Sequence, residues 1–230
     1  MAPPRPKTGT ALRTPRAAAV AGILFSVLLG LALVLINVSV PSDPATTGDW
    51  LADPGRRALF AVALELVPFA GIAFLWFIGV VRDRIGQRED RFFASVFLGS
   101  GLLFVAMLFV GAAFAAGLIA DVAAGSAAAP GPGLLALGRQ ISSLLLRLYA
   151  MRMAAVFTIS TATIGLRTKV IPRWIGMAGL AVAVVLLVSV GLTVWAELLF
   201  PAWILLLSLD ILRSGSGQPP ATAGTGAHTA

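Results

Sequence analysis

The chain has 230 residues, of which 58% are apolar and only 12% are charged, and its formal net charge is +7. A soluble fold of this size lacks the polar side chains to cover such an apolar core, so the composition predicts an integral membrane protein. The basic residues fall in short clusters between apolar runs, which indicates membrane topology and not nucleic-acid binding. The chain has no cysteine, and its one histidine is His228, so disulfides, thiolate catalysis and haem or zinc binding by a buried imidazole are excluded.

The first forty residues divide into a tail and a first predicted helix. Residues 1–16 are rich in proline and basic side chains, so we expect a disordered tail. Residues 17–40 form an apolar run that is longer than the core of a cleaved signal peptide, and Pro41 follows it directly. This run is therefore predicted to be an uncleaved first transmembrane helix, within a membrane domain that covers residues 17–212.

The rest of the chain alternates apolar runs with short polar connections. A run of about 20 apolar residues is long enough to cross a bilayer as a helix. Five further runs fit this description and are predicted to be transmembrane helices: 58–81, 92–120, 141–166, 174–194 and 196–212. Residues 213–230 are expected to form a second disordered tail.

Lysine and arginine are distributed unevenly over the connections. Twelve of them lie in the two tails and in the connections 82–91 and 167–173, whereas the other side has only three, namely Arg56, Arg57 and Arg139. The positive-inside rule therefore predicts that both termini are cytoplasmic. Because backbone amides in lipid must bond within their own helix, the predicted fold class is an all-α polytopic membrane bundle of six transmembrane helices.

The composition also suggests where the protein is found. Arginine outnumbers lysine by 15 to 2 and alanine is abundant, which suggests a GC-rich bacterial genome. We therefore expect a multi-pass protein of the bacterial cytoplasmic (inner) membrane, with the lipid bilayer as its partner. The connection 82–91 alternates basic and acidic residues, and it is interpreted as a solvated hairpin or as a contact with anionic lipid headgroups.

Small residues recur every four positions in two of the predicted helices. These positions are Ala18, Gly22, Ser26 and Gly30 in the first helix, and Ala150, Ala154, Thr158 and Ala162 in the fourth. Small side chains let helices approach closely in lipid, where water does not drive apolar surfaces together. We therefore expect both faces to be buried, and leucine in place of Gly22 or Gly30 to lower the melting temperature in detergent.

Four polar side chains within or beside the apolar runs form the candidate site: Glu65, Arg147, Tyr149 and Arg152. An arginine at the centre of a bilayer costs roughly 2.5–3.5 kcal/mol, so it usually marks a functional site or a charge pair. Glu65 is the acid that the sequence places nearest to Arg152. A polar pair of Glu65 and Arg152 is therefore predicted in the outer half of the bundle.

The depth of Arg152 depends on where the fourth helix enters the membrane. If the helix enters near Ile141, Arg152 lies close to the midplane. If it enters near Leu148, Arg147 lies among the headgroups and Arg152 extends its long side chain back to the surface. The second interpretation is favoured by a polar stripe of four-residue spacing that starts at Arg139 and ends at Arg147.

The sequence lacks the motifs of the common membrane-enzyme chemistries. It has no HExxH, GxSxG or P-loop motif, and its apolar runs have neither a histidine base nor a pair of facing aspartates. We therefore expect no enzyme activity, no cofactor and no bound metal.

Three stretches carry a resemblance to a known family: LVPFAGIAFLWFIGVVRDRIGQREDRFFASVFLGSGLLFVAMLF (67–109), YAMRMAAVFTISTATIGLRT (149–168) and IPRWIGMAGL (171–180). They resemble a family of small bacterial multi-pass membrane proteins of unassigned function. The resemblance implies a six-helix membrane bundle, and it assigns no catalytic or binding residue.

The sequence is compatible with two functions from different classes. The first is a structural, accessory or partner-binding membrane protein. The alternative is a transporter of ions or small molecules that uses the four polar residues, since six spans divide into two inverted halves of three. A water-filled cavity that reaches Arg152 would favour transport, and dry, packed surroundings would favour the first function.

Overall fold

The computed structural model describes residues 14–40, 53–85, 91–124, 132–188 and 194–215. This part of the chain is helical and contains no strand, which confirms the all-α part of the prediction. In chain order the elements are α1 (Thr14–Ser39), α3 (Pro54–Ile85), α4 (Arg91–Ala124), α5 (Pro132–Ser143), η2 (Leu144–Tyr149), α6 (Ala150–Thr168), α7 (Arg173–Val188), η3 (Val194–Leu198) and α8 (Leu199–Gly215). The element η2 is a π-helix that joins α5 to α6 without a break, and η3 is a 3-10 helix that leads into α8.

Five of the helical stretches in the described ranges are long and apolar enough to cross a membrane: Arg16–Ser39, Pro54–Arg82, Ala94–Ala120, Ala136–Thr168 and Trp195–Ser214. The sixth, α7, is apolar but shorter. Most of the remainder of the helix predicted over 174–194 lies outside the described residues, and Val194 already belongs to η3. The predicted tails likewise lie outside the described residues, apart from the first turn of α1 and the last turn of α8.

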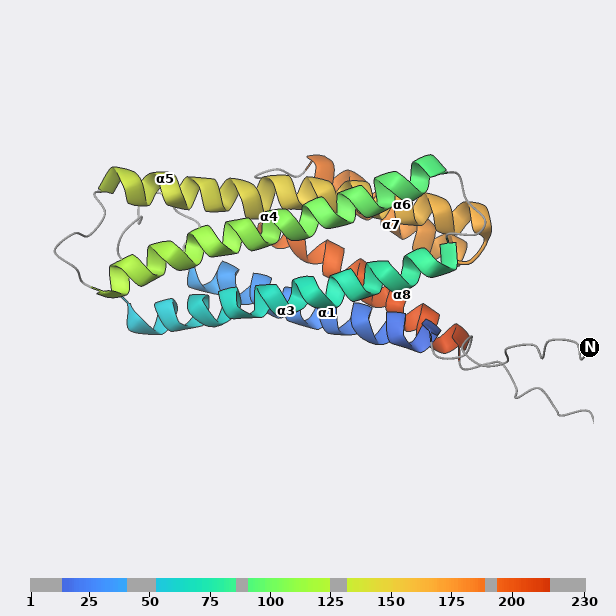
Figure 1. The fold of residues 1–230 in the computed structure, drawn as a ribbon, viewed down its shortest axis with the longest axis horizontal. Helices are drawn as coiled ribbons and strands as arrows, with labels where there is room; N and C mark the ends of the chain where they lie inside the picture. Colours follow the sequence, from blue (N-terminus) through green and yellow to red (C-terminus); the bar gives the residue numbers. More distant parts are fainter. Residues whose placement is uncertain (1–13, 41–52, 86–90, 125–131, 189–193, 216–230) are drawn as a thin grey trace, which may run out of the picture.

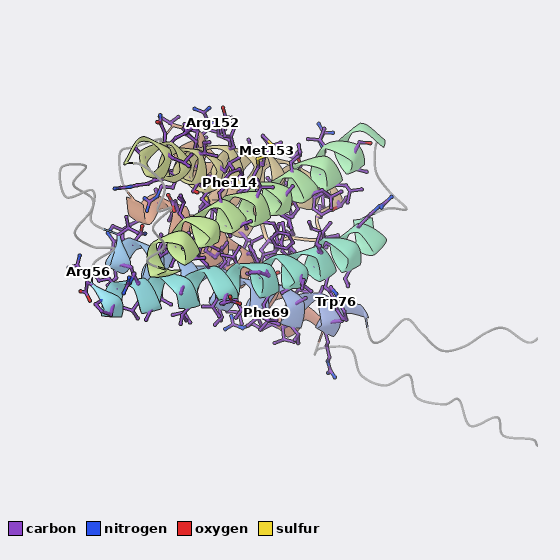
Figure 2. The ribbon with its side chains drawn as sticks, turned by 60° about the vertical axis from the view of Figure 1, so that its left-hand side comes forward. Arg56, Phe69, Trp76, Phe114, Arg152 and Met153 are labelled. Carbon is purple, nitrogen blue, oxygen red and sulfur yellow. The ribbon has the colours of Figure 1, made fainter. Side chains whose placement is uncertain are left out.

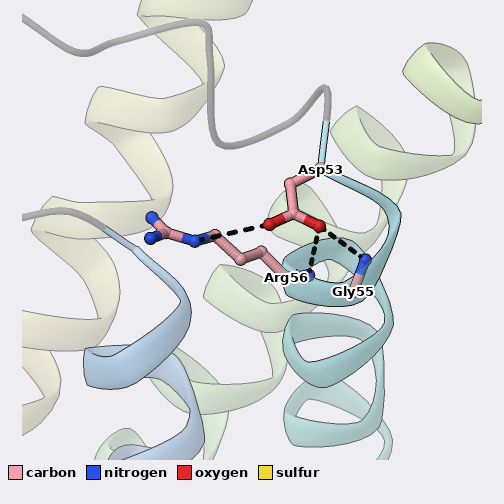
Figure 3. Close-up of polar contacts among 3 residues, drawn as sticks. All are labelled: Asp53, Gly55 and Arg56. Carbon is pink, nitrogen blue, oxygen red and sulfur yellow. Dashed lines mark hydrogen bonds and ion pairs between the residues drawn. The ribbon is translucent and has the colours of Figure 1, made fainter.

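The second helix starts before the predicted residue 58, because a capping motif extends it to Pro54. The Asp53 carboxylate accepts hydrogen bonds from the backbone N–H of Gly55 at 2.8 Å and of Arg56 at 3.5 Å (Figure 3). It also lies 3.7 Å from Nε of Arg56. Aspartate at the cap and proline at the first helical position are favoured, since these residues satisfy or remove backbone donors that have no helical acceptor.

The helical stretches run in alternating directions along the long axis of the bundle, so the start of α1 and the end of α8 lie at the same end (Figure 1). Helix α1 packs against α3 and α8, and α6 packs between α4 and α7. Exposed basic residues mark the end of the bundle where α1 starts: Arg16, Arg82, Arg167, Arg173 and Arg213. We call this the basic end.

Seven buried phenylalanine rings fill the middle of the bundle and join five of its helices. They are Phe25 of α1, Phe74 and Phe77 of α3, Phe97 and Phe104 of α4, Phe157 of α6 and Phe200 of α8. Their ring centroids lie 4.5 to 6.3 Å apart, mostly in tilted or edge-to-face arrangements. Such geometry is preferred because the positive edge of one ring meets the negative face of the next. We call these residues the phenylalanine cluster.

Helix α7 packs mainly against α6, and it also contacts α8 through Trp203. The indole Nε1 of Trp203 donates a hydrogen bond to the backbone carbonyl of Ile175 at 3.0 Å. The indole ring also lies directly on Gly179, where a Cβ atom would come within 2.7 Å of Cε2 of Trp203. A glycine is therefore needed at this crossing of α7 and α8.

The small-residue faces of α1 and α6 are both packed closely against neighbouring helices over most of their length. Ala150, Ala154 and Thr158 of the fourth helical stretch are fully buried. On α1, a Cβ atom at Gly22 would collide with Oγ of Ser208 and with the ring of Phe77. Ser26 is also buried, and its hydroxyl donates to the Gly22 carbonyl at 2.7 Å.

Gly30 does not share this environment, since a Cβ atom there would meet nothing within 4 Å. The structure therefore gives a packing reason for leucine at Gly22 to lower the melting temperature, but none for leucine at Gly30. Four-residue spacing places two positions on one face of a helix, but it does not say how far along the helix the neighbouring helices remain in close contact.

We predict that Gly22→Ala lowers the melting temperature in detergent, because the added methyl group overpacks the contact with Ser208 and Phe77 at a cost of about 1–3 kcal/mol. Gly30→Ala adds the same methyl group to the same helix and is the matched control. It should leave the melting temperature unchanged or raise it, since alanine favours a helix over glycine by about 1 kcal/mol. Equal decreases in thermal unfolding of the two purified variants would contradict this packing.

Candidate functional site

Arg147 joins three separate elements at the end of the bundle opposite the basic end. Its Nη2 atom donates a hydrogen bond to Oδ1 of Asn37, near the end of α1, at 2.9 Å. Its Nη1 atom lies 3.7 Å from Oε1 of Glu197 in η3. We call Asn37, Arg147 and Glu197 the Arg147 cluster.

The guanidinium group suits this position because its nitrogens form a rigid planar fork that can reach two partners at once. Glu197 is only 8% exposed, so its carboxylate needs a compensating charge. The 3.7 Å separation is longer than a direct hydrogen bond, so the attraction between Arg147 and Glu197 is mainly coulombic. The contact with Asn37 supplies the directional bond and orients the guanidinium group.

A proline explains why Glu197 lies in a 3-10 turn and not within α8. In a continuous α-helix the backbone N–H of residue 201 would bond the carbonyl of residue 197. Residue 201 is Pro201, which has no N–H, so the α-helix begins only at Leu199 and the preceding turn adopts 3-10 geometry. The carboxylate of Glu197 therefore projects from a turn that packs against the end of α1.

The π-helix that carries Arg147 differs from the uninterrupted α-helix that the sequence predicts. A π turn contains one more residue than an α turn, so it rotates the side chains before it relative to those after it. Gly111 of α4 accommodates this turn, since a Cβ atom there would lie 2.7 Å from Cγ of Leu146 and 3.2 Å from Cβ of Leu145. The two leucines therefore face α4, while Arg147 reaches Asn37 and Glu197.

The structure does not bring together the four residues predicted as a site. Glu65 is exposed on α3, Tyr149 is 50% exposed at the end of η2, and Arg152 is exposed on α6. Only Arg147 is turned into the bundle, with 29% of its side chain exposed.

The predicted pairing of Glu65 with Arg152 within one chain is therefore corrected. Among the described residues Glu65 has no ion pair, and the buried acid that has a basic partner is Glu197, which lies next to Arg147. Figure 2 shows Arg152 on one side of the bundle, and Phe69, which is on the same helix as Glu65, on the opposite side. The prediction failed because α4 packs between α3 and α6, and an agreement in depth does not reveal which helices are neighbours.

Asn37 and Glu197 are site residues that the sequence reasoning missed, although counting residues along each helix could have found them. Asn37 lies 21 residues after Arg16, which corresponds to about 32 Å of helix. Arg147 lies 20 residues before Arg167, or about 30 Å. Glu197 lies 16 residues before Arg213, or at least about 24 Å, because a 3-10 turn rises faster than an α turn. All three residues therefore belong to the end of the bundle far from the basic end.

The chemistry that this arrangement supports is limited. The cluster combines a permanent cation, a carboxylate and an amide, and none of these side chains is a nucleophile paired with a base. Within the described ranges, no group of three His, Cys, Asp or Glu side chains could hold a metal ion. An open groove between the end of α4 and α5 is lined by residues with apolar side chains or none: Ala113, Phe114, Gly117, Leu118, Leu134, Leu137, Gly138 and Ile141. Such a groove suits a hydrocarbon chain and not a polar substrate.

Comparison with models of protein families, with curated proteins and with solved structures finds no match to this chain. The resemblance of residues 67–109, 149–168 and 171–180 to a family of small membrane proteins therefore stays a prediction.

We predict that Arg147→Met lowers the free energy of unfolding by about 1–3 kcal/mol, because the substitution leaves the Glu197 carboxylate buried without its cation. Adding Glu197→Gln should recover part of this loss, since a neutral amide no longer requires the positive charge. Arg173→Met, which removes an exposed guanidinium at the basic end, is the control and should cost less than about 0.5 kcal/mol. If the effects of Arg147→Met and Glu197→Gln are additive in a double-mutant cycle, the two side chains are not coupled.

Proposed function

We propose that the protein is a six-span integral membrane protein of the bacterial cytoplasmic membrane, with both termini cytoplasmic and a structural, accessory or partner-binding role. The observation that carries this proposal is the distance along the helices between two sets of polar groups, the basic end and the Arg147 cluster. About 30 Å of apolar helix lies between the basic end and the Arg147 cluster, and the hydrocarbon core of a bilayer is also about 30 Å thick. In this arrangement the basic end lies in the cytoplasmic headgroups and the Arg147 cluster in the outer headgroups.

The sixth span in this proposal is α7. It starts at the basic end with Arg173, and its 16 residues rise about 24 Å. Helix α8 then returns to the basic end (Figure 1). The chain leaves the basic end after Thr168 and is back there at Gly215, so it must cross the membrane once in each direction. In this proposal α7 makes the first crossing and α8 the second, even though the described part of α7 is shorter than the other spans.

The same arrangement favours the second of the two interpretations for the fourth helix. Arg147 lies at the outer boundary and Arg152, about 23 Å from Arg167, lies just inside it. From there the long side chain of Arg152 can extend toward the headgroups, as Arg side chains near helix ends do.

The phenylalanine cluster supports a structural or partner-binding role over transport. A transporter needs a polar path at the middle of the membrane, usually at the interface of its two halves. In this bundle the corresponding place is filled by aromatic rings, and Glu65, Tyr149 and Arg152 lie on outward faces.

Reporter fusions test the six-span topology. We expect alkaline phosphatase, which is active only outside the cytoplasm, to be active when fused after residue 47, 127 or 191. A green fluorescent protein, which folds only in the cytoplasm, should fluoresce when fused after residue 87 or 170 or at the C-terminus. Phosphatase activity at the C-terminus would place that terminus outside, either through an odd number of spans or through a reversed orientation, and would contradict the proposal.

A further inference from the structure

Glu65 interrupts an otherwise apolar outward face of α3. The exposed neighbours on this face are Val62, Phe69, Ile72 and Trp76, with exposed fractions of 52%, 60%, 50% and 70%. Among the described residues, Glu65 has no hydrogen bond or ion pair. Acidic residues on the lipid-facing side of a membrane helix are rare and expensive, so their presence usually indicates a partner.

Arg152 is the corresponding cation on α6. It is exposed, and among the described residues it also has no ion pair or hydrogen bond. The next residues on its outward face are Val156 and Ile159. Both are half-buried, because α4 and α7 flank α6 on its two sides. The outward face of α6 therefore lies between two helices and carries one positive charge near its outer end.

The two charges lie at nearly the same depth. Glu65 is 17 residues before Arg82, or about 26 Å of helix from the basic end, and Arg152 is 15 residues before Arg167, or about 23 Å. Helix α3 and the stretch that contains α6 run in the same direction (Figure 1). Two copies that stand side by side in one membrane, with the same orientation, would therefore present Glu65 and Arg152 to each other at matching height.

The pair cannot form within one chain, because the faces that carry the two residues point away from each other. In Figure 2 the side chains of Phe69 and Trp76 lie on one side of the bundle, and those of Arg152 and Met153 lie on the opposite side. Helix α4 packs between α3 and α6. A contact between copies would bring the two opposite charges together.

We propose that the partner of this protein is a second copy of the same chain, with Glu65 on α3 of one copy paired with Arg152 on α6 of the next. The inference rests on the proposed membrane insertion, because it is the bilayer that fixes both residues at one depth. The exposed rings of Phe69 and Trp76 then pack on the outward face of α6 between α4 and α7. Burial in the interface removes both charges from lipid and pairs them in a medium of low dielectric constant.

The contact joins two different surfaces, so it is heterologous. A heterologous contact leaves one free α3 face and one free α6 face on every pair, and it continues into a closed ring or an open row. A symmetric dimer, in contrast, would place the same face of both copies together. This difference gives the proposal a direct test.

The absence of native cysteine makes pairwise cross-linking in membranes the appropriate experiment. Phe69→Cys with one affinity tag and Val156→Cys with another are co-expressed, and the membranes are treated with a short membrane-permeant bis-maleimide. We expect a product that carries both tags. Val27→Cys, at a 55% exposed position on α1, replaces Phe69→Cys in the matched control and should give at least about tenfold less product.

Charge variants then test the ion pair itself. Glu65→Gln on the Phe69→Cys chain should reduce the two-tag product several-fold. Glu65→Arg on that chain should abolish the product, and Arg152→Glu on the Val156→Cys chain should restore it. Each variant is also checked for membrane insertion by the reporter fusions, so that a loss of self-association is distinguished from a loss of topology.

The outcomes separate the two proposals. A Phe69–Phe69 product without a Phe69–Val156 product would indicate a symmetric contact and overturn the heterologous one. A Phe69–Val156 product that Glu65→Gln leaves unchanged would overturn the ion pair. No cross-linked product of either kind from chains with intact topology would overturn self-association while the six-span topology stands, and failed insertion of the unsubstituted chain would overturn both.

Discussion

The phenylalanine cluster is the interaction on which the other features of the bundle depend. Between helices in lipid there is no hydrophobic drive, so association relies on close packing and on dispersion contacts. Seven buried rings supply these contacts at one place and connect α1, α3, α4, α6 and α8. Helix α7 packs against α6 and is hydrogen-bonded to Trp203 of α8. Because the rings occupy the centre, charged side chains are confined to the ends of the helices or to the outer surface.

The distribution of polar groups follows from this constraint. Several hydroxyls within the helices donate to the carbonyl four residues earlier in the same helix, as Ser100 does to Val96 and Thr158 to Ala154, so they place no demand on neighbouring helices. The Arg147 cluster, which does connect different elements, lies where the helices end. Glu65 and Arg152 lie on the outer surface of the bundle, away from the phenylalanine cluster.

The helical class and the helical runs could be predicted from the sequence. Long apolar runs separated by charged clusters are compatible with few folds other than a bundle of membrane helices. The start of α3 could have been predicted as well, since Asp53 and Pro54 are a recognisable cap. Counting residues along the helices could have placed Asn37, Arg147 and Glu197 at one end of the bundle. Their contacts could not have been predicted, because the π turn that directs Arg147 has no clear sequence signal. Gly22 and Gly30 look equivalent in the sequence, but only contacts with Ser208 and Phe77 distinguish them.

Water accessibility along residues 134–166 tests most directly whether the bundle is closed and dry below the Arg147 cluster. Single cysteines are introduced into the cysteine-free chain, and intact membranes are treated with a water-soluble thiol reagent. We expect rapid labelling at Leu137→Cys and Leu144→Cys, which lie beyond about 30 Å of helix from Arg167, and no labelling at Ala154→Cys or Thr158→Cys. Labelling at Ala154→Cys or Thr158→Cys would show that water reaches the core and would contradict a structural or partner-binding role.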